Sequence, residues 1–303
     1  MIFRRFILRS QNISQVQIIW RNLSDYQRNV NIAYTIYPEG NLVKNQPTPV
    51  FVLHGLFGSK SNWRSLAKRI ALETKRQVVT LDARNHGESG HDPKINYLLM
   101  RDDLLRMMDA MGVEKAILLG HSMGGKTVMC FALSKPERVS SLIVVDTAPV
   151  ISPGGKMFKL YAEEMKNADI SSISSLTEAR NKVGNALKAV VSDVGIQQFL
   201  LTNLTQSENK TIAWRVNLDA IIDNVDDICS FPEFASTYDR KVLFIGGSDS
   251  EHIHESAKPI IRKLFPTAAI EYISNAGHWV HADKPEEFLQ KVKEFIHSTH
   301  GES

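Results

Sequence analysis

The serine at position 122 stands in a sequence pattern that favours nucleophilic chemistry. GHSMG at residues 120–124 is a G-x-S-x-G motif that directly follows a predicted strand and directly precedes a predicted helix. The serine backbone is strained at such a sharp turn, and the flanking glycines let neighbouring backbone approach closely. The turn also places the hydroxyl at a helix N-terminus, where free N–H groups face developing negative charge. The pattern therefore predicts acyl transfer with Ser122 as the nucleophile.

A histidine near the C-terminus supplies the base that a serine nucleophile needs, because a hydroxyl is a poor nucleophile at neutral pH. His278 lies in NAGHW, after the last predicted strand, and Gly277 gives that loop the freedom to turn the imidazole inward. The order of nucleophile and then histidine is typical of α/β hydrolases. His281 is a nearby rival, whereas His252 and His254 lie in a polar loop and are expected at the surface.

Three aspartates are candidates for the acid that orients this base. Asp249, in IGGSDS, occupies the commonest place after a late strand, and Asp146 ends the strand in IVVDTAPV. Asp219, in WRVNLDAI, would have to reach down from an inserted segment. Spacing alone leaves the three open.

The segment HGLFGS at residues 54–59 follows the first buried strand and predicts an oxyanion-binding loop. Two preorganised backbone donors stabilise an oxyanion, and removing one donor costs roughly 3–4 kcal/mol. We expect the N–H groups of Met123 and Leu56 to be these donors, and His54 to brace the loop through hydrogen bonds. This chemistry requires no metal and no organic cofactor.

The elements that must position these groups alternate between short β-branched runs and helical patterns, which predicts βαβ units and a parallel sheet. Predicted parallel strands cover 50–53, 77–81, 115–119, 142–145, 242–245 and 270–273, and an early antiparallel strand covers 30–37. The fold predicted is an α/β-hydrolase fold with a mostly parallel eight-stranded sheet and flanking helices. Its core comprises residues 30–149 and 236–298.

Residues 150–235 have a different character, because they are mostly helical in pattern and lack a strand-like run. We interpret them as a helical lid inserted after the sixth strand of the sheet. Its large apolar side chains are expected to supply an acyl pocket; they are Met157, Phe158, Tyr161, Phe199, Leu200 and Trp214. Such a pocket suits a lipid or medium-chain acyl group.

The charge distribution separates the first residues from the rest of the chain. The formal net charge is +3, yet residues 1–24 hold four arginines and no acid, so the remainder carries −1. A near-neutral body offers no basic surface for nucleic acid, and no apolar run approaches the ~18 residues of a transmembrane helix. The Arg-containing, acid-free segment 1–24 has the composition of a mitochondrial transit peptide, which predicts a matrix protein.

Taken together, FVLHGLFGSKSNW, VVTLDARNHGESG, LLGHSMGGKTVM, VVDTAPV and NAGHWVHAD resemble the abhydrolase domain-containing protein 11 family and its bacterial esterase relatives. The resemblance covers roughly residues 30–298. It implies a mitochondrial serine hydrolase active on ester bonds, with lipid esters such as diacylglycerol as substrates, and a connection to the 2-oxoglutarate dehydrogenase complex. Ser122 and His278 match the nucleophile and base of the family. For the acid, the resemblance favours Asp146, because relatives often lack an acid at the place of Asp249, with Asp219 as the second candidate. The presence of Asp249 in this chain departs from that pattern and keeps the choice open.

Two alternative functions follow from the same residues. A thioesterase or a carbon–carbon hydrolase would use the same nucleophile, base and lid. A function of another class is a non-catalytic partner that stabilises a mitochondrial dehydrogenase complex. Dehalogenase chemistry and carboxylate-nucleophile epoxide hydrolysis are disfavoured, because position 122 holds a serine instead of an aspartate.

Overall fold

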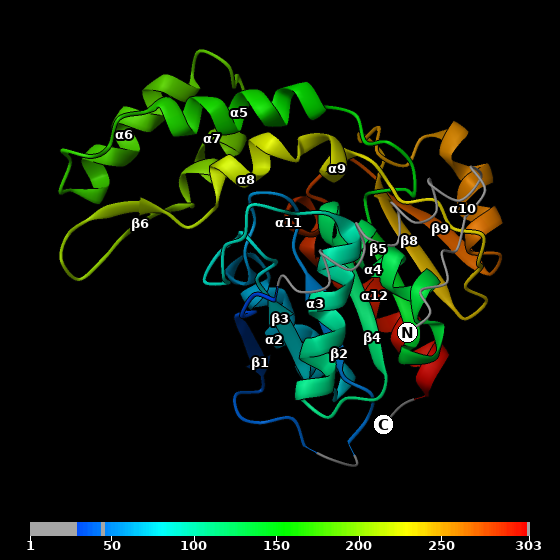
Figure 1. Ribbon diagram of the computed structural model, residues 1–303. Helices are drawn as coiled ribbons and strands as arrows, with labels where there is room; N and C mark the ends of the chain where they lie inside the picture. Colours follow the sequence, from blue (N-terminus) through cyan, green and yellow to red (C-terminus); the bar gives the residue numbers. More distant parts are fainter. Residues whose placement is uncertain (1–28, 44–45, 302–303) are drawn as a thin grey trace, which may run out of the picture.

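The computed structural model describes residues 29–43 and 46–301. Its main sheet has seven strands within these residues, in the order β1-β3-β2-β4-β5-β8-β9 (Figure 1). The strands are β1 (Tyr34–Tyr37), β2 (Val50–Leu53), β3 (Val78–Leu81), β4 (Ala116–His121), β5 (Val139–Val145), β8 (Val242–Gly247) and β9 (Ala268–Ile273). β1 pairs antiparallel with β3, and every other pairing in this sheet is parallel. The predicted sheet type is confirmed, with one strand fewer than expected in the described part of the chain.

Helices cover both faces of the sheet. The central strands are apolar in continuous runs because successive side chains point to opposite, equally buried faces. In β2, Phe51 and Leu53 join a cluster with side chains of α3 (Tyr97–Ala110), α4 (Met123–Ser134) and α10 (Lys258–Leu264). Val50 and Val52 join the opposite cluster, which includes side chains of α2 (Arg64–Thr74), α11 (Val280–Asp283) and α12 (Pro285–His300).

A mostly helical insertion separates β5 from β8 and lies across one end of the core (Figure 1). It contains α5 (Gly155–Asn167), α6 (Leu176–Leu187), α7 (Val194–Leu201), α8 (Leu218–Asp223) and α9 (Val225–Cys229). It also contains an antiparallel pair, β6 (Leu204–Gln206) and β7 (Ile212–Trp214), so the expectation of a segment without strands was wrong. We call this insertion the lid. Its apolar side chains pack with Phe57, Met100 and Met123 of the core.

Residues 1–24, predicted to be a transit peptide, lie outside the described residues. Within the described part of the chain, none of the helices has the length and apolar character needed to cross a bilayer.

Candidate active site

Ser122 occupies a strained turn between β4 and α4, as the motif predicts. Its backbone has φ 52° and ψ −115°, an unfavourable conformation for a residue with a side chain. The Ser122 N–H donates to the Val145 carbonyl at 3.0 Å, which ties the turn to the neighbouring strand. A Cβ built on Gly120 would lie 2.3 Å from the Gly124 carbonyl oxygen, and one on Gly124 would lie 2.4 Å from the Leu53 carbonyl oxygen. Both glycines are therefore required by close backbone contact.

His278 is oriented by Asp146. Its Nδ1 lies 2.7 Å from Asp146 Oδ2, so Nδ1–H donates to the carboxylate and Nε2 is the nitrogen left for proton transfer. The imidazole comes from the loop between β9 and α11, and the aspartate from the residue that follows β5. Parallel strands end at the same edge of the sheet, which brings together groups that lie 132 residues apart.

The Asp146 side chain is fixed as well as buried. It has no solvent exposure, and its backbone φ is 47°. The Gly247 N–H donates to Oδ1 at 3.1 Å, and the Ser250 hydroxyl donates to Oδ2 at 2.5 Å. These donors satisfy the carboxylate, so it is held in one position beside His278.

The other two acid candidates do not contact His278. The side chain of Asp219 is 70% exposed and forms an ion pair with Lys166 on the lid. Asp249 is exposed and accepts a hydrogen bond from the Ser248 hydroxyl at 2.8 Å. Neither the lid candidate nor the candidate in the commonest position is placed to orient the base.

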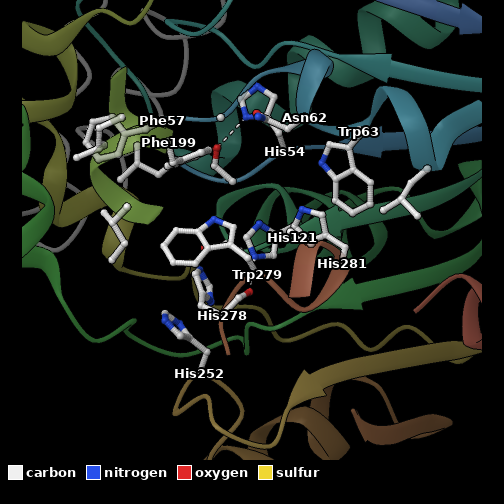
Figure 2. Close-up of a pocket in the computed structure, with 18 of the residues that line it drawn as sticks. His54, Phe57, Asn62, Trp63, His121, Phe199, His252, His278, Trp279 and His281 are labelled. Atoms are coloured by element: carbon white, nitrogen blue, oxygen red, sulfur yellow. Dashed lines mark hydrogen bonds between the residues drawn. The ribbon is translucent and has the colours of Figure 1, made fainter. Parts of the chain in front are cut away.

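Ser122 and His278 line the same cavity, whose volume is about 640 Å³. Its lid side is lined by Met157, Phe158, Tyr161, Ile196, Phe199 and Leu200. Trp214, which was expected in the pocket, lies in β7 and is not among the lining residues. Figure 2 shows Phe57 and Phe199 on one side of the cavity and Trp63 on the other, with Trp279 and His278 between them.

The loop after β2 is braced by two buried, neutral histidines. His54 Nδ1–H donates to the Gly55 carbonyl at 2.7 Å, and its Nε2 accepts from the Ala83 N–H at 3.0 Å. His86 Nδ1–H donates to the Arg84 carbonyl, and its Nε2 accepts from the Phe57 N–H at 3.2 Å. Burial lowers the pKa of His54, and it lowers the pKa of His86 to about 3. The predicted bracing by His54 is confirmed, and His86 performs the same task.

Two further histidines contact His278, and no motif in the sequence marks either of them for this role. His121 Nε2 lies 2.9 Å from the His278 carbonyl oxygen, to which it donates. His252 stacks on His278 with ring centroids 3.9 Å apart and lines the cavity (Figure 2). Burial, followed by the neighbouring His278, lowers the pKa of His252 to about 4. The expectation that His252 is a surface residue was therefore wrong, while His281 stacks on Trp63 as a buried residue.

Asp146, His252 and His278 also offer potential metal-ligand atoms within 4.8 Å of one another. The two imidazole planes, however, are inclined by only 22° and are stacked face to face. A histidine binds a metal ion through a nitrogen lone pair in the plane of its ring, so two stacked rings do not point at one ion. The arrangement suits proton transfer better than metal binding.

A strained serine at a strand-to-helix turn, facing the same cavity as a carboxylate-oriented histidine, defines a serine hydrolase on an α/β-hydrolase fold. The comparisons with known proteins agree. The family described as "alpha/beta hydrolase fold" matches residues 48–285, and the chain belongs to this family, within it to the abhydrolase domain-containing protein 11 group.

Similar proteins are lipases and esterases. The chain is 43% identical over 267 residues to "sn-1-specific diacylglycerol lipase ABHD11" of Danio rerio, covering 88% of this chain and 83% of the relative. It is 32% identical over 250 residues to "Esterase YbfF" of Escherichia coli (strain K12), covering 82% and 93%. The solved structure "Marine microorganism esterase" superposes with a TM-score of 0.79 at 34% identity, covering 88% of this chain and all of the other. The protein is therefore a serine ester hydrolase of the carboxylesterase or lipase type.

Proposed function

We propose that this enzyme hydrolyses lipid esters of the diacylglycerol type, or esters with medium-length acyl chains, through an acyl-enzyme on Ser122. The observation that carries the proposal is the shared cavity of Ser122 and His278, because its volume of about 640 Å³ exceeds what a short acyl group needs. The name of the Danio rerio relative, a diacylglycerol lipase, supports the same substrate class.

In the first half of the reaction, the Ser122 hydroxyl attacks the acyl carbonyl carbon and His278 Nε2 takes the hydroxyl proton. Asp146 stabilises the resulting imidazolium through its hydrogen bond to Nδ1. The N–H groups of Met123, at the first position of α4, and of Leu56, in the loop after β2, stabilise the oxyanion. His278 then gives its proton to the departing alcohol.

In the second half, a water molecule attacks the acyl-enzyme and gives a proton to His278. The same two N–H groups stabilise the second oxyanion, and the imidazolium returns the proton to Ser122 as the fatty acid leaves. Residues of this chain supply the nucleophile, the base and the oxyanion donors in both halves, and water is the second substrate.

The lining of the cavity combines apolar side chains with a few polar ones. The apolar lid side chains, such as Phe158 and Phe199, suit the acyl chain. The lining also includes the neutral polar side chains Asn62 and Ser65, and an Arg69–Glu286 ion pair. Paired charges and neutral polar groups favour an uncharged alcohol portion such as a glycerol ester.

Assays on dispersed diacylglycerol, on a medium-chain glyceride and on the matching acyl-CoA thioesters test this proposal. We expect kcat/KM for the glycerides to exceed that for the thioesters at least tenfold, and Ser122→Ala to abolish both activities. Preferred turnover of acyl-CoA would support the thioesterase alternative. Equal turnover of acetate and long-chain esters would contradict the assignment of the lid cavity to the acyl chain.

We also propose that the protein acts in the mitochondrial matrix, in contact with the 2-oxoglutarate dehydrogenase complex. The acid-free composition of residues 1–24 supports the location, and the family resemblance supports the partner. Fusing residues 1–28 to a fluorescent protein tests the location, and affinity purification of the full chain from mitochondria tests the partner.

A fluorophosphonate probe tests the alternative of a purely non-catalytic role. A protein with that role would remain unlabelled by the probe.

A further inference from the structure

The strained residue Phe57 is held from both sides by side chains that come from different parts of the molecule. Its φ is 60°, in the left-handed region that a residue with a side chain rarely adopts. Such a conformation costs about 1–3 kcal/mol and persists only where the surroundings enforce it. Phe57 directly follows Leu56, whose N–H is the proposed oxyanion donor.

One of the two contacts comes from the core. His86 Nε2 accepts a hydrogen bond from the Phe57 N–H at 3.2 Å. The low pKa of His86, about 3, keeps this imidazole neutral and its Nε2 available as an acceptor at physiological pH.

The other contact comes from the lid. Asn203 lies between α7 and β6, and its Nδ2 donates to the Phe57 carbonyl oxygen at 2.9 Å. The same amide donates to the Leu200 carbonyl at 3.2 Å, and the Asn203 carbonyl accepts from the Arg215 N–H at 2.9 Å. Asn203 is 3% exposed, so its hydrogen bond to the core is shielded from water.

We infer that Asn203 is a positioning residue through which the lid holds the oxyanion loop in its productive shape. The hydrogen bond fixes the peptide group that follows Phe57, while His86 fixes the one that precedes it. Together they define the backbone orientation around the neighbouring Leu56 N–H. Oxyanion stabilisation depends on donors that are aimed before the reaction begins, so a loosened loop loses rate even when substrate still binds. This inference rests on the proposed assignment of Leu56.

The chain offers a matched control. Gln197 is a second buried amide of the lid, 7% exposed, and its Nε2 donates to the Val191 carbonyl at 2.7 Å within the lid itself. Gln197→Met removes a buried lid hydrogen bond without touching the loop after β2. Asn203→Leu removes the bond that joins lid to loop. A difference in kcat between the two variants is therefore due to loss of the hydrogen bond between Asn203 and Phe57, and not to general damage to the lid.

Steady-state kinetics on a soluble short-chain ester and on a long-chain ester test the inference in the full-length protein. We expect Asn203→Leu to lower kcat by 10- to 100-fold on both esters with KM changed less than threefold, and Gln197→Met to change kcat less than threefold. The inhibition constant of a trifluoromethyl ketone, which forms an oxyanion on the serine, should weaken in Asn203→Leu by about the factor lost in kcat. Circular dichroism and thermal unfolding establish that the variants are folded.

Unchanged kcat in folded Asn203→Leu, or an equal loss in Gln197→Met, would overturn the inference, as would a loss confined to KM. Should Asn203→Leu fail to fold, Asn203→Ser carries the same prediction with a hydroxyl too short to reach the Phe57 carbonyl. Failure of the proposed function is distinguishable, because it would appear in the wild-type protein as preferred turnover of acyl-CoA or as equal turnover of acetate and long-chain esters. The inference instead concerns the change in kcat from wild type to Asn203→Leu on one and the same ester.

Discussion

His252 and His278 lie face to face, with ring centroids 3.9 Å apart and planes inclined by 22°. The pKa of His252 is lowered to about 4, first by burial and second by His278, so His252 is neutral at physiological pH. A neutral ring beside the base leaves His278 free to become an imidazolium during catalysis. A charged neighbour would oppose that step.

Replacing His252 by a cation should therefore impair the base. We expect His252→Lys to lower kcat/KM at pH 7.5 at least tenfold and to move the acid limb of the pH–rate profile to lower pH, because a nearby positive charge opposes protonation of the base. His252→Phe, which keeps a stacked neutral ring, should stay within fivefold of wild type. An acid limb that moves to higher pH in the lysine variant would refute this electrostatic role.

Asp146→Asn should be the most damaging of the aspartate substitutions. An asparagine leaves the geometry nearly intact but favours the wrong tautomer of His278, a change that costs about 10⁴ in kcat in a comparable triad. Asp219→Asn and Asp249→Asn should each retain activity within threefold, since neither side chain contacts His278. The measurement is kcat on a soluble ester. A larger loss in either of the latter variants would mean that the acid is not Asp146.

The Arg69–Glu286 ion pair in the cavity lining should set a preference for uncharged substrates. In Glu286→Gln, Arg69 loses its bidentate partner, and kcat/KM for an ester with an anionic alcohol portion should rise at least threefold relative to its neutral counterpart. Glu271→Gln breaks a comparable pair with Lys291 on the surface and serves as the control. If both variants respond alike, or if neither does, Arg69 and Glu286 have no part in selectivity.

The buried Lys126 should make the free energy of unfolding depend on pH. It is 1% exposed and donates to the Cys229 and Ser230 carbonyls at 2.7 and 2.9 Å, and burial lowers its pKa to about 7. The unfolded chain therefore binds the extra proton between about pH 7 and the ordinary lysine pKa, so this residue makes stability rise with pH across that window. Below pH 7 both states are protonated and the dependence ends.

Denaturant unfolding at pH 6.5, 7.5 and 8.5 checks the sign. The free energy of unfolding of wild type, minus that of Lys126→Met, should increase from pH 6.5 to 8.5. A difference that falls over this range would show that the folded state favours the ammonium form.

The sheet and the reactive serine could be predicted from the sequence because both depend on local patterns. Continuous apolar runs such as 116–119 indicate strands buried on both faces. The glycines around Ser122 indicate that neighbouring backbone approaches closely, as it does in the structure. The acid could not be chosen this way, since the choice depends on where a carboxylate lies relative to His278 across 132 residues. The prediction for His252 was wrong for the same reason. Its neighbours in sequence are polar and indicate a surface loop, whereas its stacking on His278 depends on the three-dimensional fold.

The lid shows a similar limit. Its helices follow from periodicity, but β6 and β7 are three residues each and owe their pairing to the packing around them. The contact between Asn203 and Phe57 joins residues 146 positions apart, and the local sequence around either residue does not predict it.

The covalent chemistry of Ser122 is the central feature of the proposed mechanism. The decisive measurement is mass spectrometry of the full-length protein after brief incubation with a slowly deacylating ester, followed by mapping of the acylated peptide. We expect one acyl group on the peptide that contains Ser122, no acylation in Ser122→Ala, and acylation slowed at least a thousandfold in His278→Ala. Acylation of a different residue, or ester hydrolysis at the wild-type rate in Ser122→Ala, would contradict the assignment of Ser122 as the nucleophile.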